Sequence, residues 1–454
     1  MSFEGTEPPQ DWSVVPLGSV AELRFSSVDK LSYPSEEPVR LCNYTDVYNN
    51  DYITDDIDFM RASATQPEIV RFGLKDGDVI ITKDSETPDD IGIPTVVDSA
   101  AQDVVCGYHL ALIRPNKEEI DSTFLAKQLG HFRLARYFGQ QANGLTRYGL
   151  PIRAVANAPL WLPGQNEQRS AGNVLRLVDE AIAKTESVIA KLRQVRVGLL
   201  HDLLTRGLDE HGQLRDPVAH PEQFQDTPLG RFPREWIFEP LGERLQRIAG
   251  TIQTGPFGSQ LHAHEYTAEG VPVIMPQDIL EGYVSVAKIA RISVTRAEEL
   301  KRHRVRLGDL IFSRRGDLSR CAAITDREVG WMCGTGCLLM RFEETTLSAK
   351  WLSLAYRHDT GQRQVAARAV ETTMVNLNTK LLSHLQFGFP HKEEQDVVVC
   401  RVTQADSAIL QEEANLSKLT LMKSGLMDDL LIGRVRVPAE VATDRQEQEK
   451  VSSV

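Results

Sequence analysis

The residues that could catalyse a reaction do not stand at the spacings that catalysis requires. An adenine methyltransferase of the usual kind carries an Asn/Asp-Pro-Pro-Tyr/Phe pocket, but the only Pro-Pro pair here is Pro8-Pro9. No Gly-x-x-x-x-Gly-Lys-Ser/Thr loop is present to cradle the phosphates of ATP. Asp89 and Asp90 come nearest to the carboxylates of a nuclease, but they lack an acid-x-Lys partner. The sequence therefore predicts no catalytic residue in this chain.

The cysteines and histidines do not form a metal-binding motif. A structural zinc site takes four ligands in close pairs, and Cys321, Cys333 and Cys337 do not supply them, so we expect packed strand residues. His262-Ala263-His264-Glu265 lacks the His-Glu-x-x-His order of a zinc protease and suits a loop. The six cysteines are scattered, which predicts reduced thiols of a cytoplasmic protein rather than a disulfide framework. We expect no bound metal.

A group of basic residues is the clearest candidate for a binding surface. Residues 301–320 hold seven basic side chains and two acidic ones, although the net charge of the chain is −12. A local patch of this kind can meet phosphate groups whatever the global charge. A solvated face without a ligand is the alternative, and charge alone does not decide between them. The basic residues are Lys301, Arg302, Arg304, Arg306, Arg314, Arg315 and Arg320, and the acids are Asp309 and Asp317.

The elements that must position these residues occur twice, 227 residues apart. Leu160-Trp161-Leu162-Pro163 returns as Phe387-Gly388-Phe389-Pro390, and Cys106-Gly107 returns as Cys333-Gly334. In the same register, Glu167-Gln168 returns as Glu394-Gln395 and Asp202-Leu203-Leu204 as Asp429-Leu430-Leu431. This period is far longer than the 20–50 residues of a solenoid repeat. It indicates two copies of a whole module, each with a globular part and a helical part, suited to a two-part target.

Each copy predicts one long helix. Proline, which breaks helix interiors, is absent between Pro163 and Pro217 and between Pro390 and Pro438. Steps of three and four residues give an apolar seam in both windows, interrupted at matched positions by Thr185 and Arg196 in the first and by Glu412 and Lys423 in the second. One such seam would suit an amphipathic core helix, but two matched seams predict an intramolecular coiled coil whose direction the seam does not reveal. The apolar seam residues are Leu175, Val178, Ile182, Ile189, Leu192, Leu199 and Leu203, then Val402, Ala405, Ile409, Leu416, Leu419, Leu426 and Leu430.

The two globular parts share a scaffold but not their exposed chemistry. Each contains a Gly-Asp turn followed by a β-rich run, at residues 77–82 and 308–313, which predicts a mixed α+β domain with a substantial sheet. After this strand one module offers Lys83-Asp84-Ser85-Glu86-Thr87 and the other Arg314-Arg315-Gly316-Asp317. Residues 208–235 show no periodicity and are predicted to be a loop that links the modules. The polar tail is predicted to be disordered.

The remaining composition is that of an ordinary folded soluble protein. The chain has 454 residues, of which 41% are hydrophobic and 25% charged, a length that suggests about three domains. No window approaches 18 uninterrupted apolar residues, so we expect no membrane span and no membrane partner. The first residues lack the basic and apolar regions of a signal peptide, which again favours the cytoplasm.

Over almost its whole length the chain resembles the DNA-specificity subunits of type I restriction–modification systems. The most specific stretch is Thr254-Gly255-Pro256-Phe257-Gly258-Ser259-Gln260-Leu261, which is similar to one subtype of target-recognition domain. Cys42-Asn43-Tyr44-Thr45-Asp46-Val47-Tyr48 resembles another subtype, and the Pro-x-x-x-Glu-Gln entry at Pro163 and Pro390 is characteristic of the long helices. The first module lacks the Gly-Pro-Phe-Gly loop and has residues 24–30 instead, which implies a different half-site.

The resemblance implies an α+β fold with two mixed α/β target-recognition domains and two long helices that pair as an antiparallel coiled coil with pseudo-two-fold symmetry. It also implies double-stranded DNA as ligand, two copies of a DNA methyltransferase subunit and an ATP-dependent endonuclease subunit. S-adenosylmethionine, ATP and magnesium would then be held by partners, and this chain would bind no cofactor and be no enzyme. The expected divisions are 1–165 and 236–392 for the recognition domains, 166–207 and 393–434 for the helices, 208–235 for the linker and 435–454 for the tail.

Such a function needs side chains that match the groove edges of bases, since arginine pairs with guanine and asparagine or glutamine with adenine. Any single candidate could instead be a surface polar residue or a turn former. In the first module the candidates are Asn43, Tyr44, Lys83, Ser85, Thr87, Asn143, Thr146, Arg147 and Tyr148. In the second module they are Ser259, Gln260, Gln277, Arg314, Arg315, Thr372, Thr373, Asn376, Asn378 and Lys380. Two modules held apart by a helical rod predict a bipartite target with a spacer of fixed length, and the unlike chemistry of the modules predicts an asymmetric target. The alternative function is a docking adaptor that binds a methyltransferase and no DNA, against which the basic run weighs.

Overall fold

Two units, each with one globular module and part of both long helices, make up the computed structural model. It describes residues 7–99, 103–258, 260–369 and 376–437. Unit 1 comprises Met1–Val188 with Glu412–Val454, and unit 2 comprises Ile189–Gln411. Among the described helices, none is both long and apolar enough to cross a membrane.

The module of unit 1 is built on a five-stranded sheet in the order β2-β10-β6-β8-β4, with a three-stranded sheet, β5-β3-β9, beside it. The central strand β6 has three apolar residues in succession, Val79, Ile80 and Ile81, because both faces of the strand are buried. Ile80 packs with residues of the smaller sheet, whereas Val79 and Ile81 pack with Phe124 and Phe138 of the helices α4 and α5. The elements are β1 (Ser13–Pro16), α1 (Leu17–Val20), β2 (Ala21–Phe25), β3 (Glu37–Cys42), α2 (Tyr44–Asn49), β4 (Tyr52–Ile53), β5 (Met60–Ala64), α3 (Gln66–Phe72), β6 (Val79–Thr82), β7 (Asp84–Ser85), β8 (Pro94–Val97), β9 (Val104–Cys106), β10 (Leu110–Pro115), α4 (Ser122–Gly130), α5 (Phe132–Gln141), β11 (Tyr148–Gly149), α6 (Ile152–Ala156) and β12 (Pro159–Leu162).

The module of unit 2 repeats this arrangement. Its five-stranded sheet has the order β16-β24-β21-β22-β19, and a four-stranded sheet, β17-β20-β18-β23, takes the place of the three-stranded one. Strand β21 again has two buried faces, since Leu310 and Phe312 join one core cluster and Ile311 another. The elements are β15 (Ile237–Pro240), α8 (Leu241–Arg247), β16 (Thr251–Thr254), β17 (Tyr266–Thr267), β18 (Val271–Ile274), β19 (Glu281–Gly282), β20 (Ala290–Ile292), α9 (Val294–Glu299), β21 (Leu310–Ser313), β22 (Cys321–Ala323), β23 (Met332–Cys333), β24 (Cys337–Arg341), α10 (Ala349–Arg357), α11 (Asp359–Ala369), α12 (Thr379–Ser383) and β25 (Gln386–Phe389), with short 3-10 turns η2 (Ala263–Glu265), η3 (Pro276–Asp278), η4 (Lys301–His303) and η5 (Asp326–Glu328).

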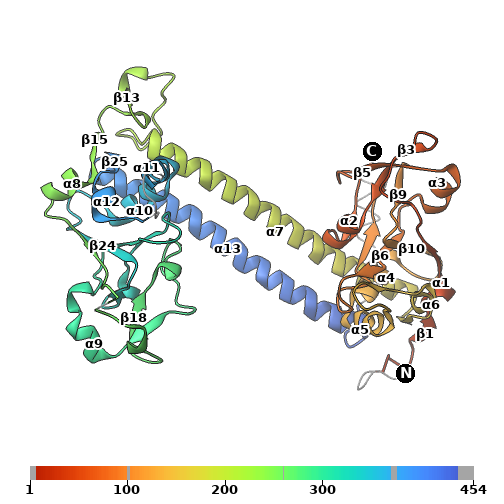
Figure 1. Cartoon of the computed structure of the whole chain (residues 1–454). Helices are drawn as coiled ribbons and strands as arrows, with labels where there is room; N and C mark the ends of the chain where they lie inside the picture. The colour runs from red at the N-terminus through yellow and green to blue at the C-terminus, as the bar shows by residue number, and fades with distance from the viewer. Residues whose placement is uncertain (1–6, 100–102, 259, 370–375, 438–454) are drawn as a thin grey trace. The chain divides into compact units, whose positions relative to one another are not determined.

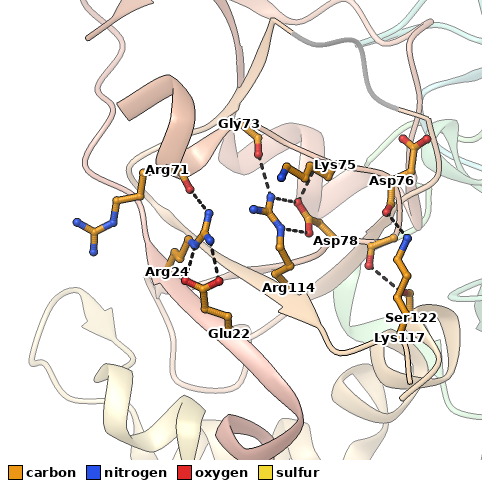
Figure 2. Close-up of polar contacts among 11 residues, drawn as sticks. Glu22, Arg24, Arg71, Gly73, Lys75, Asp76, Asp78, Arg114, Lys117 and Ser122 are labelled. Atoms are coloured by element: carbon orange, nitrogen blue, oxygen red, sulfur yellow. Dashed lines mark hydrogen bonds and ion pairs between the residues drawn. The ribbon is translucent and has the colours of Figure 1, made fainter. Parts of the chain in front are cut away.

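The Gly-Asp turn before each central strand is held by a buried ion pair. In unit 1, Arg114 of β10 donates from Nε and Nη2 to the Asp78 carboxylate at 2.8 and 2.6 Å, and from Nη2 to the Gly73 carbonyl at 3.0 Å (Figure 2). In unit 2, Arg341 of β24 binds Asp309 in the same bidentate manner at 2.8 and 2.5 Å. Both carboxylates are 2% exposed. The charges shared by the two copies thus build the scaffold.

The prediction of two long helices is confirmed. Helix α7 spans Gln165–Thr205 and α13 spans Lys392–Leu431, and each follows the last strand of a module (Figure 1). Gly207 and Gly433 are the second residues after the two helices and have φ of 63° and 74°. Left-handed backbone of this kind ends a helix, and glycine adopts it without steric cost.

The ends of both helices belong to the module cores. Leu175 near the start of α7 and Leu430 near the end of α13 lie in the core of unit 1. Val398 near the start of α13 and Leu203 near the end of α7 lie in the core of unit 2. All the predicted seam positions are buried or half-buried, and most positions between them are exposed. Every position of the two apolar stripes is therefore at least partly shielded from solvent.

In each unit an acid of one long helix pairs with a cation of the other. In unit 1, Nζ of Lys423 lies 2.8 Å from the Asp179 carboxylate and 2.7 Å from that of Asp51. Burial alone would lower the pKa of Lys423, but these two carboxylates raise it above its usual value. In unit 2, Nε of Arg196 donates to Asp406 at 2.5 Å. The two cations are the matched polar interruptions of the seam, and Asp179 and Asp406 also lie 227 residues apart.

The glutamine of each Glu-Gln motif is buried at the start of its helix. In unit 2 the Gln395 side chain accepts from the backbone N–H of Ser348 at 2.7 Å and donates to the carbonyls of Pro390 and Thr346 at 2.8 and 3.2 Å. In unit 1, Gln168 makes the same set of bonds to Asp121, Pro163 and Glu119. These buried bonds attach each long helix to the N-cap residue of a helix in its module, which is Asp121 of α4 in unit 1 and Ser348 of α10 in unit 2.

Two expectations from the sequence need correction. Residues 208–235, predicted to be a loop, contain a hairpin of β13 (Phe224–Thr227) and β14 (Gly230–Pro233), preceded by the 3-10 turn η1 (Pro221–Gln223). The hairpin forms because Phe224 and Phe232 are buried and the short turn holds Gly230 at a φ of 119°.

The tail predicted to be disordered from residue 435 begins with placed residues, and its residues 438–454 lie outside the described part. Arg436 pairs with Asp11 at 2.8 Å and with Glu167. Arg215 of the hairpin segment pairs with Glu235 at 2.8 Å and with Glu394 at 3.0 Å. In both units, therefore, an arginine from the segment after a long helix pairs with the glutamate of a Glu-Gln motif.

We expect Gln395→Ala to destabilise unit 2 by about 3 kcal/mol, because it leaves a buried N–H and two carbonyls without their partner. Urea unfolding followed by circular dichroism measures this. Gln404→Ala, at an exposed position of the same helix, is the control and should change stability by less than about 0.5 kcal/mol. Equal effects of the two substitutions would contradict the role assigned to Gln395.

Candidate nucleic-acid interface

In unit 1 two chain segments bring most of the predicted residues together. The segment after β6 forms β7, and the segment after α5 forms β11, which pairs with it in the register Tyr148 to Ser85. The backbone N–H of Leu150 donates to the Lys83 carbonyl at 2.8 Å. Asn143 and Gly149 exchange backbone hydrogen bonds of 3.0 and 2.9 Å, which close the loop that carries Thr146 and Arg147. The candidates of both segments therefore lie at one place.

Exposure divides these candidates into two groups. Thr87, Asn143, Thr146 and Arg147 are exposed, and Tyr148 is half-buried. Ser85 and Lys83 are buried, and Nζ of Lys83 lies 3.2 Å from the Asp84 carboxylate and 4.4 Å from the Tyr108 ring centre. The first group can meet a ligand directly, whereas Lys83 must leave its ion pair to do so. The predicted residues Asn43 and Tyr44 are half-buried at the start of α2.

Aromatic residues that sequence reasoning missed accompany these side chains. Tyr48 stacks on Tyr44 with ring centres 5.6 Å apart, and its hydroxyl donates to Asp90 at 3.1 Å. Tyr108 is 51% exposed and lies beside His109, which contacts the Asp84 carboxylate at 2.9 Å. Exposed aromatic rings offer stacking surfaces and polar tips. The position of Tyr108, directly after the repeated Cys-Gly pair, is the signal that could have drawn attention to it.

In unit 2 the equivalent segments meet in the same way. The backbone N–H of Leu377 donates to the Arg314 carbonyl at 3.0 Å, and the Arg314 N–H donates to the Gly336 carbonyl at 2.8 Å. Nε of Arg314 donates to Oδ1 of Asn376 at 3.1 Å. Two residues predicted separately are thus direct partners. Arg314 stands where unit 1 has Lys83, so one scaffold presents different hydrogen-bonding groups at the same point.

The glycine-rich loop and the 3-10 turn η3 lie at the same end of the sheet. Gly255 donates to the Cys337 carbonyl at 2.9 Å, beside the strand end at which Ser313 pairs with Cys337. Gln277 is exposed, and its carbonyl accepts from Arg320 at 3.3 Å. Phe257, which was not among the predicted residues, is 54% exposed in this loop. The second candidate surface therefore combines three loops at one end of the five-stranded sheet.

The other predicted residues of unit 2 have mixed placements. Arg315 and Lys380 are exposed. Oδ1 of Asn378 accepts from the Leu381 N–H at 2.8 Å, so this side chain caps α12. Gln260 accepts from the Phe257 N–H at 3.1 Å and helps to close its own loop. Ser259, Thr372 and Thr373 lie outside the described residues.

The basic run at 301–320 is divided by strand β21 and does not form one continuous patch. Lys301, Arg302, Arg304 and Arg306 precede the strand, whereas Arg314, Arg315 and Arg320 follow it. Four strand residues span about 13 Å at roughly 3.3 Å each. Arg304 also pairs with Glu298 at 3.1 Å and Arg320 with Asp317 at 3.2 Å. Only the second group lies with the other candidates of this unit.

The cysteines in question pack in the cores. Cys321 belongs to one core cluster of unit 2, and Cys333 and Cys337 belong to another. Burial raises the pKa of Cys321 to about 12, which opposes the thiolate form that binds zinc. Within the described ranges, no group of three or more His, Cys, Asp or Glu residues is placed to hold a metal ion.

Comparisons with known proteins identify specificity subunits as relatives. No protein-family model matches the chain. It is 19% identical over 440 residues to the type I restriction enzyme MjaVIII specificity subunit of Methanocaldococcus jannaschii, covering 96% of this chain and 95% of that protein. It is also 23% identical over 278 residues to the putative type I restriction enzyme MjaX specificity subunit of the same organism, where the match spans 59% of this chain and 60% of the relative.

Solved structures share the fold. The S subunit of a type I restriction–modification system from M. genitalium matches with a TM-score of 0.55 at 16% identity, over 95% of this chain and 97% of that one. A chain from a structural study of complex assembly and conformational transition of the type I restriction–modification system matches with a TM-score of 0.53 at 16% identity, over 94% of this chain and 100% of that one. The resemblance to type I specificity subunits is therefore confirmed, and the mixed α/β modules with long helices are the fold that these structures have.

His303, inside the basic run, makes unit 2 sensitive to acid. Its side chain is 3% exposed, and burial, together with the charge of Arg302, lowers its pKa from 6.5 to about 4. The unfolded chain therefore binds a proton that the folded chain does not, and stability falls as the pH drops from 6.5 towards 4, by at most about 3 kcal/mol.

We expect His303→Gln to reduce this loss, as measured by the difference in unfolding free energy between pH 6.5 and 4.5. His211→Gln, at a side chain that is 78% exposed, should leave the pH dependence unchanged. An identical pH dependence for His303→Gln and the unaltered chain would show that His303 does not titrate in this range.

Proposed function

We propose that this chain is the DNA-specificity subunit of a type I restriction–modification system, that it reads double-stranded DNA and that it catalyses no reaction. The observation that carries the proposal is that the same two chain segments are joined by an equivalent backbone hydrogen bond in both modules. Leu150 bonds to the Lys83 carbonyl in one, and Leu377 bonds to the Arg314 carbonyl in the other. A common frame that presents unlike side chains suits a reader of two different sequences. The relatives named as specificity subunits support this function.

We infer further that α7 and α13 form an antiparallel intramolecular coiled coil. From Asp179 to Arg196 the residue numbers rise along α7, while those of their partners fall along α13 from Lys423 to Asp406. The pair in unit 1 becomes the pair in unit 2 when each residue is exchanged for its counterpart 227 residues away. This is the relation that a pseudo-two-fold axis produces, and polar seam residues commonly select such a register.

The proposed target has two short specified sequences separated by a spacer of fixed length. Each module reads one half-site, and the unlike side chains of the two modules make the target asymmetric. Half-sites on one face of B-DNA lie about 34–36 Å apart or somewhat more. A coiled coil of defined length would hold the modules at that spacing.

The proposed partners are two copies of a DNA methyltransferase subunit on the helical regions and, beyond them, an ATP-dependent endonuclease subunit. S-adenosylmethionine, ATP and magnesium would act in those subunits. A mobility-shift assay of the complex with its methyltransferase on random and cognate DNA separates this function from that of a docking adaptor. Assembly without any DNA binding would favour the adaptor.

Replacement of Arg314 and Arg315 by alanine is expected to weaken recognition of one half-site by about 1–3 kcal/mol and to leave the other half-site unchanged. The reason is that both arginines belong to the candidate surface of unit 2 alone. Methylome sequencing in cells with the cognate methyltransferase measures the relaxation. Arg363→Ala, at an exposed residue of α11, is the matched control. Equal loss at both half-sites would instead indicate a general phosphate contact.

A longer pair of helices is expected to lengthen the spacer. Four residues inserted into both α7 and α13 add one turn, or ~6 Å, and should increase the recognised spacer by roughly 2 base pairs without changing either half-site. The same insertion in the turn between β13 and β14 is the control and should leave the spacer as it was. A spacer that stays constant after the helix insertions would refute the proposed role of the coiled coil.

A further inference from the structure

A polar cleft with a volume of about 590 Å³ lies within unit 2, beside the second candidate surface. Its walls come from the last part of α7, from α10, from the strand β19 with its flanks and from the loop after β21. Seven of its ten lining residues are polar, and three of those are arginines. The lining residues are Arg196, Leu200, Leu280, Glu281, Tyr283, Asp317, Ser319, Arg320, Leu354 and Arg357.

Arg357, the last residue of α10, is the arginine of this cleft that has no direct ion-pair partner among the described residues. Its Nε is shut off from solvent without a hydrogen-bond partner, while the side chain as a whole is half-buried. Burial lowers the pKa of Arg357, although the charges of Glu281 and Asp406 act against this from a distance. A partly desolvated guanidinium gains from an anion that it can contact directly. An anion bound in the cleft would supply that contact.

The surrounding backbone is shaped around this guanidinium. Gly282 has a φ of 91°, and a Cβ at that position would lie 2.7 Å from Nη2 of Arg357. The other charges of the cleft are already balanced, since Arg196 pairs with Asp406 and Arg320 pairs with Asp317. The remaining acid, Glu281, is exposed. The cleft therefore offers one guanidinium that no carboxylate of the described residues contacts directly.

Arg320 connects the cleft to the candidate reading surface. It lines the cleft, and its Nη1 also lies 3.3 Å from the carbonyls of Pro276 and Gln277. The loop that carries Arg320 begins with Arg314 and Arg315, the two proposed base-reading arginines. A duplex that rests on the reading surface of unit 2 would thus bring its backbone to the mouth of the cleft.

We propose that the cleft between α10 and the loop after β21 binds a backbone phosphate of the DNA through the guanidinium of Arg357, with Arg320 at its entrance. This inference rests on the proposed function and adds to it a contact outside the base-reading residues. A guanidinium donates two parallel hydrogen bonds to phosphate oxygens, a geometry that lysine does not reproduce. Such a contact sets the register of the protein on the duplex and carries no sequence information.

A DNA phosphate is preferred to a carboxylate of a partner protein for two reasons. The cleft continues into the candidate DNA surface through Arg320, and most of its walls are polar, whereas the docking site of a protein segment is mostly apolar at its centre. The protein carboxylate remains a distinct outcome of the test.

The test compares Arg357→Gln with the unaltered full chain, each in complex with the methyltransferase subunit, in DNA-binding titrations at several salt concentrations. We expect about tenfold weaker binding to cognate and to random DNA alike, and a slope of log K against log salt that is smaller by about 0.9. A single neutral methylphosphonate at the contacted phosphate should weaken binding of the unaltered complex and have no further effect on the variant. Arg363→Gln, on the neighbouring helix α11, should leave every one of these quantities unchanged.

The outcomes are distinct. An unchanged slope and affinity for Arg357→Gln would overturn the proposal, and so would a loss restricted to one cognate base. Weaker assembly with the methyltransferase in the absence of DNA would show that a protein carboxylate fills the cleft. Arg357→Met controls for folding, because an uncharged side chain of similar length should preserve the packing and the melting temperature while it lowers DNA affinity. If the unaltered complex binds no DNA, the proposed function fails before the cleft is tested.

Discussion

In unit 1, a buried carboxylate on one long helix that takes a cation from the other is the constraint on which the arrangement of the helices depends. Asp179 is 5% exposed and is contacted by Lys127 at 2.6 Å, by Lys423 at 2.8 Å and by the Tyr52 hydroxyl at 2.9 Å. Lys127 and Tyr52 come from the module, and Lys423 comes from α13. A slip of α13 by one turn would take Lys423 away from this carboxylate and leave Lys127 as its cation, which would weaken the compensation of a buried charge. In the proposed coiled coil the apolar seam would supply attraction between the helices, and the ion pair would select one register among those that the seam allows.

Residues common to the two copies build the frame, whereas residues that differ between the copies lie where the frame is open. The Asp78–Arg114 and Asp309–Arg341 pairs, and the bonds of Gln168 and Gln395, repeat atom for atom because a buried polar group tolerates few alternative partners. Lys83 and Arg314 occupy one equivalent position with different side chains. In the proposed function, this division lets one fold serve two different sequence preferences, because the side chains that differ lie outside the shared set of buried bonds.

Much of the architecture could be predicted from periodicity. The spacing of Leu175, Val178 and Ile182 reports a helix face directly, because helix geometry depends on local contacts. Other features escaped prediction because they depend on contacts between distant residues. Nothing near Arg436 in the sequence indicates Asp11, and nothing near Arg314 indicates Asn376. The hairpin at 224–233 lacked a periodic signal because it has only two buried aromatic residues.

The sequence by itself determined that the chain has two related modules and two long helices, because duplicated motifs and the 3.5-residue spacing are properties of residue order. The tertiary structure alone decided which polar residues are available to a ligand. It buried Lys83 beside Asp84, used Asn378 as a helix cap, divided the basic run across β21 and left Nε of Arg357 without a hydrogen-bond partner. The physical reason is that the availability of a charge depends on the solvent and the partners around it, and these are fixed only when segments far apart in the chain come together.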